Sequence, residues 1–102
     1  MNYLITLTSP QYSYCILIKN AYEQPFTQSF LESYFKDTIF CNFIVSIKLV
    51  EYSYVFLPES FLFIVDFKEP IAFIQDQYET IYDYHDSHYF QVLSNFILTE
   101  LL

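Results

Sequence analysis

The chain has 102 residues, of which 54% are apolar and 23% are aromatic, and it contains no Gly and no Trp. Four Lys and no Arg stand against twelve carboxylates, so the formal net charge is −8. The many aromatic residues exclude a disordered acidic tail, and the few cations exclude a protein that binds nucleic acid through its phosphates. The absence of Gly excludes a Gly-rich phosphate-binding loop. A chain of this length predicts one compact domain over residues 1–102.

The first residues predict neither a signal peptide nor a membrane anchor. No basic residue precedes the first apolar run, and Thr6 interrupts it. The richest apolar stretch, residues 39–57, is broken by polar side chains before it reaches ~20 residues. Cys15 and Cys41 both lie in segments with a strand pattern, and we expect them to be reduced thiols packed as small apolar residues, with a disulfide as the alternative. These features favour a cytoplasmic protein.

A β-hairpin is predicted near the N-terminus. A period of two runs over residues 3–7, with Tyr3, Ile5 and Leu7 on one face, and again over residues 12–18. Ser9-Pro10-Gln11 separates the two runs, and because this connection has no Gly, a longer loop is favoured over a tight primed turn.

A helix is predicted from about residue 25 to residue 38. Pro25 suits the first helical position, and Glu32 and Lys36 form a favourable pair four residues apart. One face of this helix is mostly apolar and consists of Phe26, Phe30, Leu31, Tyr34, Phe35 and Thr38.

A second hairpin is predicted farther along the chain. Its first strand begins at Phe43 and continues to Phe56, Pro58-Glu59-Ser60 forms the turn, and its second strand covers residues 61–67. Both faces of these strands are rather apolar, so the sheet is either covered on both sides or meets another chain with its second face.

Helical periodicity returns after Pro70 and continues to the end of the chain. Asp86-Ser87 can cap a new helix, so we expect residues 71–101 to form two helices with a break near residue 86. The predicted fold is α+β, with an antiparallel sheet of about four strands in ββαββα(α) order and the helices packed mainly on one face.

The segment 75–90 holds the candidate interface. Asp76, Glu79, Asp83 and Asp86 are spaced to share one face of a helix, and no lysine follows Lys68 in the sequence. Tyrosines, which are enriched at protein interfaces, lie between these carboxylates. The alternative is a solvated helix face whose tyrosines belong to the core. The predicted partner-binding residues are Asp76, Tyr78, Glu79, Tyr82, Asp83, Tyr84 and Asp86.

Neither a metal site nor a catalytic site is predicted. His85 and His88 are three residues apart beside carboxylates, but the sequence has no third His, and His85 lies on the apolar stripe of the predicted helix. No local pattern joins Cys15 or Cys41 to a base, so we expect a protein that is not an enzyme and needs no cofactor.

Three functions fit these features. In size, charge and composition, though in no motif, the chain resembles the immunity proteins of bacteriocin and contact-dependent inhibition systems, which implies that it neutralises a basic nuclease toxin through its acidic surface. A phage-encoded inhibitor of a host defence nuclease, of anti-CRISPR or anti-restriction type, is the first alternative. A structural homodimer subunit with an aromatic interface is the second. We expect a basic protein partner, no direct binding of nucleic acid and no membrane.

Overall fold

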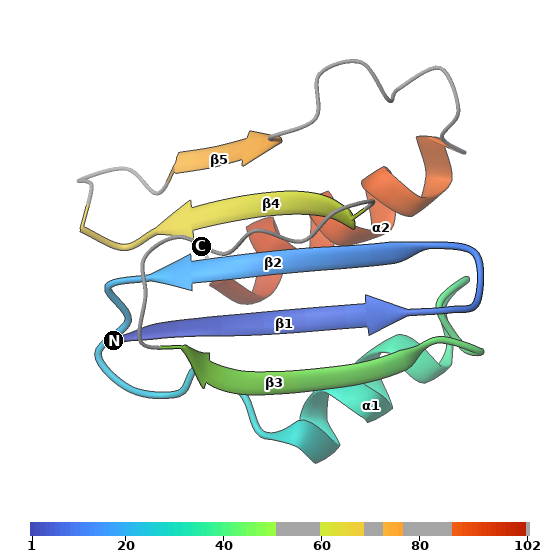
Figure 1. Ribbon diagram of the computed structural model, residues 1–102, viewed down its shortest axis with the longest axis horizontal. Helices are drawn as coiled ribbons and strands as arrows, with labels where there is room; N and C mark the ends of the chain where they lie inside the picture. The colour runs from blue at the N-terminus through green and yellow to red at the C-terminus, as the bar shows by residue number, and fades with distance from the viewer. Residues whose placement is uncertain (51–59, 69–72, 77–86, 102) are drawn as a thin grey trace.

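The computed structural model describes residues 1–50, 60–68, 73–76 and 87–101, which form one five-stranded sheet and two α-helices (Figure 1). The sheet has the strand order β3-β1-β2-β4-β5. The α+β class predicted from the sequence is confirmed. In chain order the elements are β1 (Asn2–Thr8), β2 (Ser13–Lys19), α1 (Gln28–Lys36), β3 (Ile44–Val50), β4 (Ser60–Asp66), β5 (Phe73–Asp76), α2 (Ser87–Phe96) and the π-helix η2 (Ile97–Leu101).

The predicted N-terminal hairpin is confirmed. Strands β1 and β2 pair antiparallel, from Tyr3 opposite Ile18 to Thr8 opposite Ser13. The Ser9 backbone N–H donates to the Tyr12 carbonyl at 2.8 Å, and the Ser9 hydroxyl oxygen accepts the Tyr12 N–H at 3.0 Å. The Ser9 side chain therefore stabilises a loop that has no Gly to form a tighter turn.

The sheet is mixed, so the prediction of a purely antiparallel sheet is wrong. Strand β4 pairs with β2 in parallel, and β3 pairs with β1 in antiparallel fashion. The predicted hairpin of residues 43–56 with residues 61–67 is wrong too, because β3 and β4 are not neighbours in the sheet. Strands β3 and β4 lie on opposite sides of the β1–β2 hairpin and run in the same direction, as the arrows in Figure 1 show. A tight turn joins antiparallel neighbours only.

Helix α1 is shorter than predicted. It begins at Gln28, and its N-cap is Thr27, whose hydroxyl oxygen accepts the Phe30 N–H at 3.1 Å. Pro25 is therefore not the first helical residue. At the other end, the Thr38 hydroxyl donates to the Phe35 carbonyl at 2.8 Å, and the helix stops at Lys36. Side-chain caps at both ends thus set the length of α1.

The segment predicted as helix after Pro70 includes a strand. Residues 73–76 form β5, which pairs antiparallel with β4. Four residues are too few for periodicity to separate strand from helix, and pairing with β4 supplies the backbone partners. Helix α2 is described from Ser87, and residues 77–86, which include the predicted break, lie outside the described residues. The described elements therefore follow the order ββαβββα instead of the predicted ββαββα(α).

Alternate residues of the central strands are buried on opposite faces of the sheet. Both helices lie on one side of the sheet (Figure 1), and their buried residues share one cluster with the strands. On the opposite face, Leu4, Cys15 and Leu17 form a second buried cluster. The members of the helix-side cluster include Tyr3, Ile5, Leu7, Tyr14, Ile16, Ile18, Leu31, Phe35, Phe40, Leu93 and Phe96.

The two cysteines are in different environments. Cys15 is buried in β2 and belongs to no disulfide, as predicted. Cys41 belongs to no disulfide either, but it is exposed and lies in the turn between α1 and β3. The prediction that Cys41 belongs to a strand and packs in the interior is therefore wrong. Asp37 and Asn42, which favour turns, flank this segment in the sequence.

Candidate functional site

The structure describes only one of the predicted interface residues, Asp76. It is the last residue of β5 and stands opposite Phe63 of β4. The prediction that Asp76 shares a helix face with the later carboxylates is therefore wrong, because Asp76 belongs to a strand. The other predicted residues lie outside the described part of the chain: Tyr78, Glu79, Tyr82, Asp83, Tyr84 and Asp86.

Both ends of the segment 77–86 are attached to the fold. On one side the chain leaves β5, which pairs with β4, and on the other it enters α2. The first turns of α2 are anchored by aromatic contacts. The ring of Tyr89 stacks on Tyr14 of β2 at 5.6 Å and meets Phe40 edge to face at 5.3 Å. The Phe90 ring lies 5.3 Å from Phe63. Paired strands and a packed helix thus carry both ends of the acidic segment.

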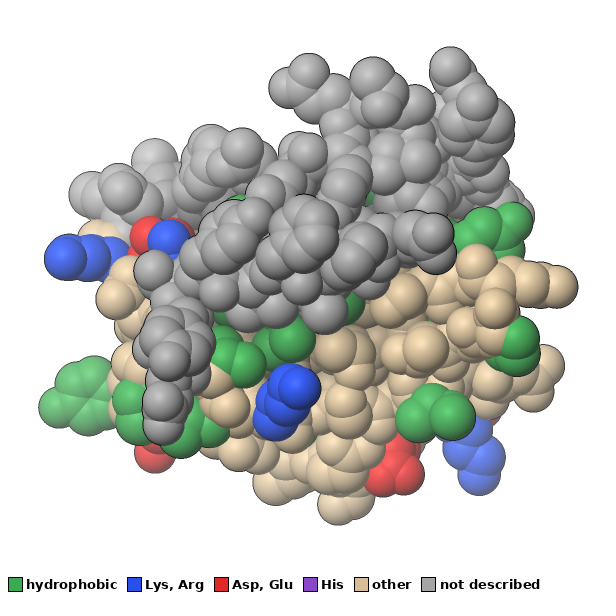
Figure 2. Space-filling view, viewed as in Figure 1, with side chains coloured by type: hydrophobic (Ala, Val, Ile, Leu, Met, Phe, Trp, Pro, Cys, Tyr) green, Lys and Arg blue, Asp and Glu red, His purple; other side chains and the backbone are tan. Residues whose placement is uncertain are grey.

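The carboxylates and the lysines are divided unevenly along the chain. All four lysines and six of the twelve carboxylates lie in the described ranges, and the other six carboxylates lie in residues 51–59, 69–72 and 77–86. Figure 2 shows charged side chains of both signs scattered over the visible described surface. Because no Lys lies in those three segments, most of the net negative charge of the protein lies in the segments that connect β3, β4, β5 and α2.

A polar cluster closes the end of the sheet where β2 ends and β4 ends. Asn20 has a positive φ of 60°, which lets its backbone turn sharply after β2. Its side-chain amide donates to the Asp66 carboxylate at 2.7 Å, and the Lys68 backbone N–H donates to the same oxygen at 2.9 Å. These two hydrogen bonds, with smaller contributions from the charges of Lys19 and Lys68, hold the pKa of Asp66 below its ordinary value of 3.8.

Replacing Asn20 with glycine is expected to raise the pKa of Asp66. The variant keeps the positive φ that glycine tolerates and removes only the amide donor, while the Lys68 N–H still holds the pKa below 3.8. Because the folded pKa of Asp66 is lowered, its contribution to stability is present above the unfolded pKa and is lost as the pH falls through the folded pKa. The unfolding free energy of Asn20→Gly should therefore depend less on pH below about pH 4. NMR titration of the Asp66 carboxyl measures the shift, and an unchanged pKa would contradict the role of the Asn20 amide.

A tyrosine of α1 packs against the end of α2. Tyr34 is half-buried and packs against Phe35 at 5.0 Å and against Phe96 at 4.9 Å. Burial, and then the nearby charge of Glu100, raises the pKa of the Tyr34 hydroxyl above its ordinary value. This hydroxyl therefore keeps its proton at neutral pH.

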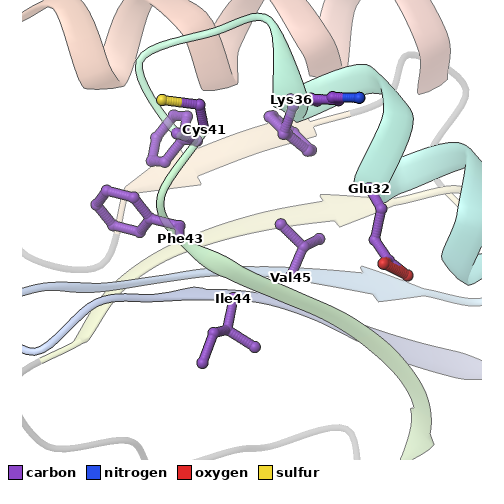
Figure 3. A pocket seen from close by; sticks show the side chains of 8 residues that line it. Glu32, Lys36, Cys41, Phe43, Ile44 and Val45 are labelled. Atoms are coloured by element: carbon purple, nitrogen blue, oxygen red, sulfur yellow. The ribbon is translucent and has the colours of Figure 1, made fainter.

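A cavity of about 320 Å³ lies between α1, the turn after it and β3 (Figure 3). Glu32 and Lys36 line it from α1, and Cys41 lines it from the turn. The rest of the lining is apolar and comprises Phe35, Phe40, Phe43, Ile44 and Val45. Sequence reasoning missed this cavity because it placed the start of the next strand at Phe43 and expected Cys41 to be buried.

Among the residues that the structure describes, few groups with acid–base or nucleophilic chemistry line the cavity. Its lining residues include one thiol, one carboxylate and one ammonium group, and His88 is not among them. A nucleophilic cysteine requires an adjacent base that a third group orients. Within the described ranges, no three His, Cys, Asp or Glu side chains come together as a metal site would require. The cavity therefore shows no catalytic arrangement among its lining residues.

Neither α-helix in the described ranges has the length and hydropathy that a membrane-spanning helix requires. In comparisons with known proteins, no protein-family model, no curated protein and no solved structure matches this chain.

Proposed function

We propose that this chain is a small acidic binding protein that neutralises a basic protein partner. The partner class that fits it best is a bacterial nuclease toxin, which makes this chain a cytoplasmic immunity protein and not an enzyme. Nucleases that cut RNA or DNA present basic surfaces to their substrates, and an acidic protein binds such surfaces tightly and quickly.

One observation carries this proposal. Residues 69–102 contain six carboxylates and no Lys, and the tyrosine-rich segment 75–90 holds four of those carboxylates. In the described part of the chain, this segment starts on β5 and ends on α2, whose Leu93 and Phe96 are fully buried. Holding both ends of a binding segment on a packed frame lowers the conformational entropy that is lost on binding.

A phage-encoded inhibitor of a host nuclease presents the same chemistry to its target, so the two functions differ in the partner and not in the surface. A structural homodimer is a third function, in which the excess aromatic residues form the interface between copies. The experiment below separates these three functions.

The test is affinity capture with this protein as bait in a lysate of its source. A basic nuclease encoded beside its gene supports the immunity function, whereas a restriction enzyme or a CRISPR effector supports the phage inhibitor. The captured nuclease should lose activity at an equimolar amount of the bait, and the complex should weaken as the salt concentration rises. A matched bait that carries Glu79→Gln and Asp83→Asn should capture less of it. Recovery of this chain alone would overturn the proposal and favour the homodimer.

A further inference from the structure

One side chain of α1 makes hydrogen bonds to the backbone of a strand. The Gln28 amide nitrogen donates to the Val45 carbonyl at 2.5 Å, and the Gln28 amide oxygen accepts the Ile47 N–H at 3.2 Å. The orientation of the amide follows from its partners, because a carbonyl only accepts a hydrogen bond and a backbone N–H only donates one. Gln28 is otherwise an exposed polar residue at the start of the helix.

These bonds fall on the outer side of an edge strand. Strand β3 ends the sheet, with β1 on its inner side. In an extended strand, the N–H and the C=O of one residue point to the same side, so the backbone groups of Val45, Ile47 and Leu49 face outward. The Val45 carbonyl and the Ile47 N–H are the two groups that a parallel neighbouring strand would bond. Gln28 therefore takes the place of the N–H and C=O of one residue of a further strand.

The sequence of β3 favours pairing with another strand. Its seven residues contain four β-branched residues, one charge and neither Gly nor Pro. Two of its apolar side chains are exposed, Ile44 at 76% and Leu49 at 56%. An edge strand with these properties pairs readily with another chain unless something covers it.

A second copy of β3 fits this edge. If two copies pair antiparallel about Ile47, Lys48 of one copy stands opposite Ser46 of the other, so no like charges meet. Ile44 then stands opposite Val50, and Val45 stands opposite Leu49. In this register the Val45 carbonyl and the Ile47 N–H bond the other copy, so they cannot also bond Gln28.

We propose that Gln28 is a gatekeeper that occupies the backbone groups of the β3 edge and keeps this strand from pairing with a second copy of the chain. The proposal is independent of the partner-binding function, since it concerns the edge of the sheet opposite β5.

The test is the molar mass of Gln28→Leu in solution. Leucine removes both hydrogen bonds and keeps a side chain of similar length, so the variant should form dimers at concentrations at which the wild-type chain keeps a smaller mass. The amide exchange of Ile47 should accelerate by roughly tenfold in dilute samples, where the copies are separate, in line with the loss of one hydrogen bond. Gln91→Leu is the matched control, because Gln91 is an exposed glutamine on the other helix, α2. Its mass and the exchange of its Ile47 amide should equal those of the wild type.

A second substitution tests the register of the pairing. Ser46→Lys, added to Gln28→Leu, sets two ammonium groups opposite each other in the proposed dimer and should restore the wild-type mass. The proposal would be overturned if Gln28→Leu folds and keeps the wild-type mass, or if Gln91→Leu associates as strongly as Gln28→Leu does. A double variant that still dimerises would overturn it too. If Gln28→Leu does not fold, Gln28→Glu keeps the acceptor for Ile47 and removes the donor to Val45. The mean molar mass of Gln28→Glu should then lie above that of the wild type and below that of a full dimer. An unchanged molar mass would overturn the proposal.

Discussion

Replacing Phe40 with alanine is expected to lower the free energy of unfolding by about 3–5 kcal/mol, the usual cost of removing a fully buried phenylalanine ring. Phe40 is 1% exposed. Its ring meets Tyr14 at 5.5 Å, Phe43 at 4.9 Å and Tyr89 at 5.3 Å. Through these contacts it joins the α1–β3 turn to β2 and α2. Because small domains are stable by only about 5–15 kcal/mol, this single change should remove a large fraction of the stability.

Urea unfolding followed by circular dichroism measures this loss. Tyr22→Ala is the matched control, since Tyr22 is 98% exposed, and its effect should stay within about 0.5 kcal/mol. A loss below about 1 kcal/mol for Phe40→Ala would contradict the packing of this ring in the core.

Reversing Glu79 and Asp83 to lysine is expected to weaken partner binding by more than a few kcal/mol, the range for charge pairs that lose their water at an interface. The two residues lie outside the described part of the chain, in the segment that joins β5 to α2. The fold should stay intact, because β5 and α2 are held by other contacts. Isothermal titration with the captured partner measures the change.

The matched control reverses Glu23 and Asp37, which are exposed and lie outside the acidic segment. This control changes the formal charge by the same amount. It should weaken binding far less, since exposed charges beyond ~8–10 Å are largely screened at physiological salt. Unchanged affinity in Glu79→Lys/Asp83→Lys would contradict the proposed interface and move it to the segment 51–59, which also carries two carboxylates.

Local patterns in the sequence predicted the elements better than their pairing. The alternation around Ser9 predicted the first hairpin, and the spacing of Leu31 and Phe35 predicted the helix that covers it. The partners of β3 and β4 were not predictable in this way. Both strands alternate regularly, but alternation does not specify which neighbour a strand pairs with, and β3 joins β1 whereas β4 joins β2 on the other side of the hairpin.

The candidate sites were predictable only in part. The acidic, tyrosine-rich composition of the segment 75–90 is visible in the sequence, whereas the strand at Phe73–Asp76 depends on pairing with β4. Gln28 has no sequence signal at all. A glutamine on the polar face of a helix is ordinary, and its role arises only because α1 lies beside the edge of the sheet.

The parallel pairing of β2 with β4 also has a consequence during synthesis on the ribosome. The first fifty residues contain β1, β2, α1 and β3, so three adjacent strands and their covering helix are made before β4 exists. Because synthesis proceeds at about 5–20 residues per second, the outer side of β2 has no β4 to pair with for a few seconds, until residues 60–66 emerge. Nascent chains of this protein therefore pass through a stage in which Ile16, Leu17 and Ile18 lie on an open strand edge, and crowding of ribosomes on one message would bring such edges together.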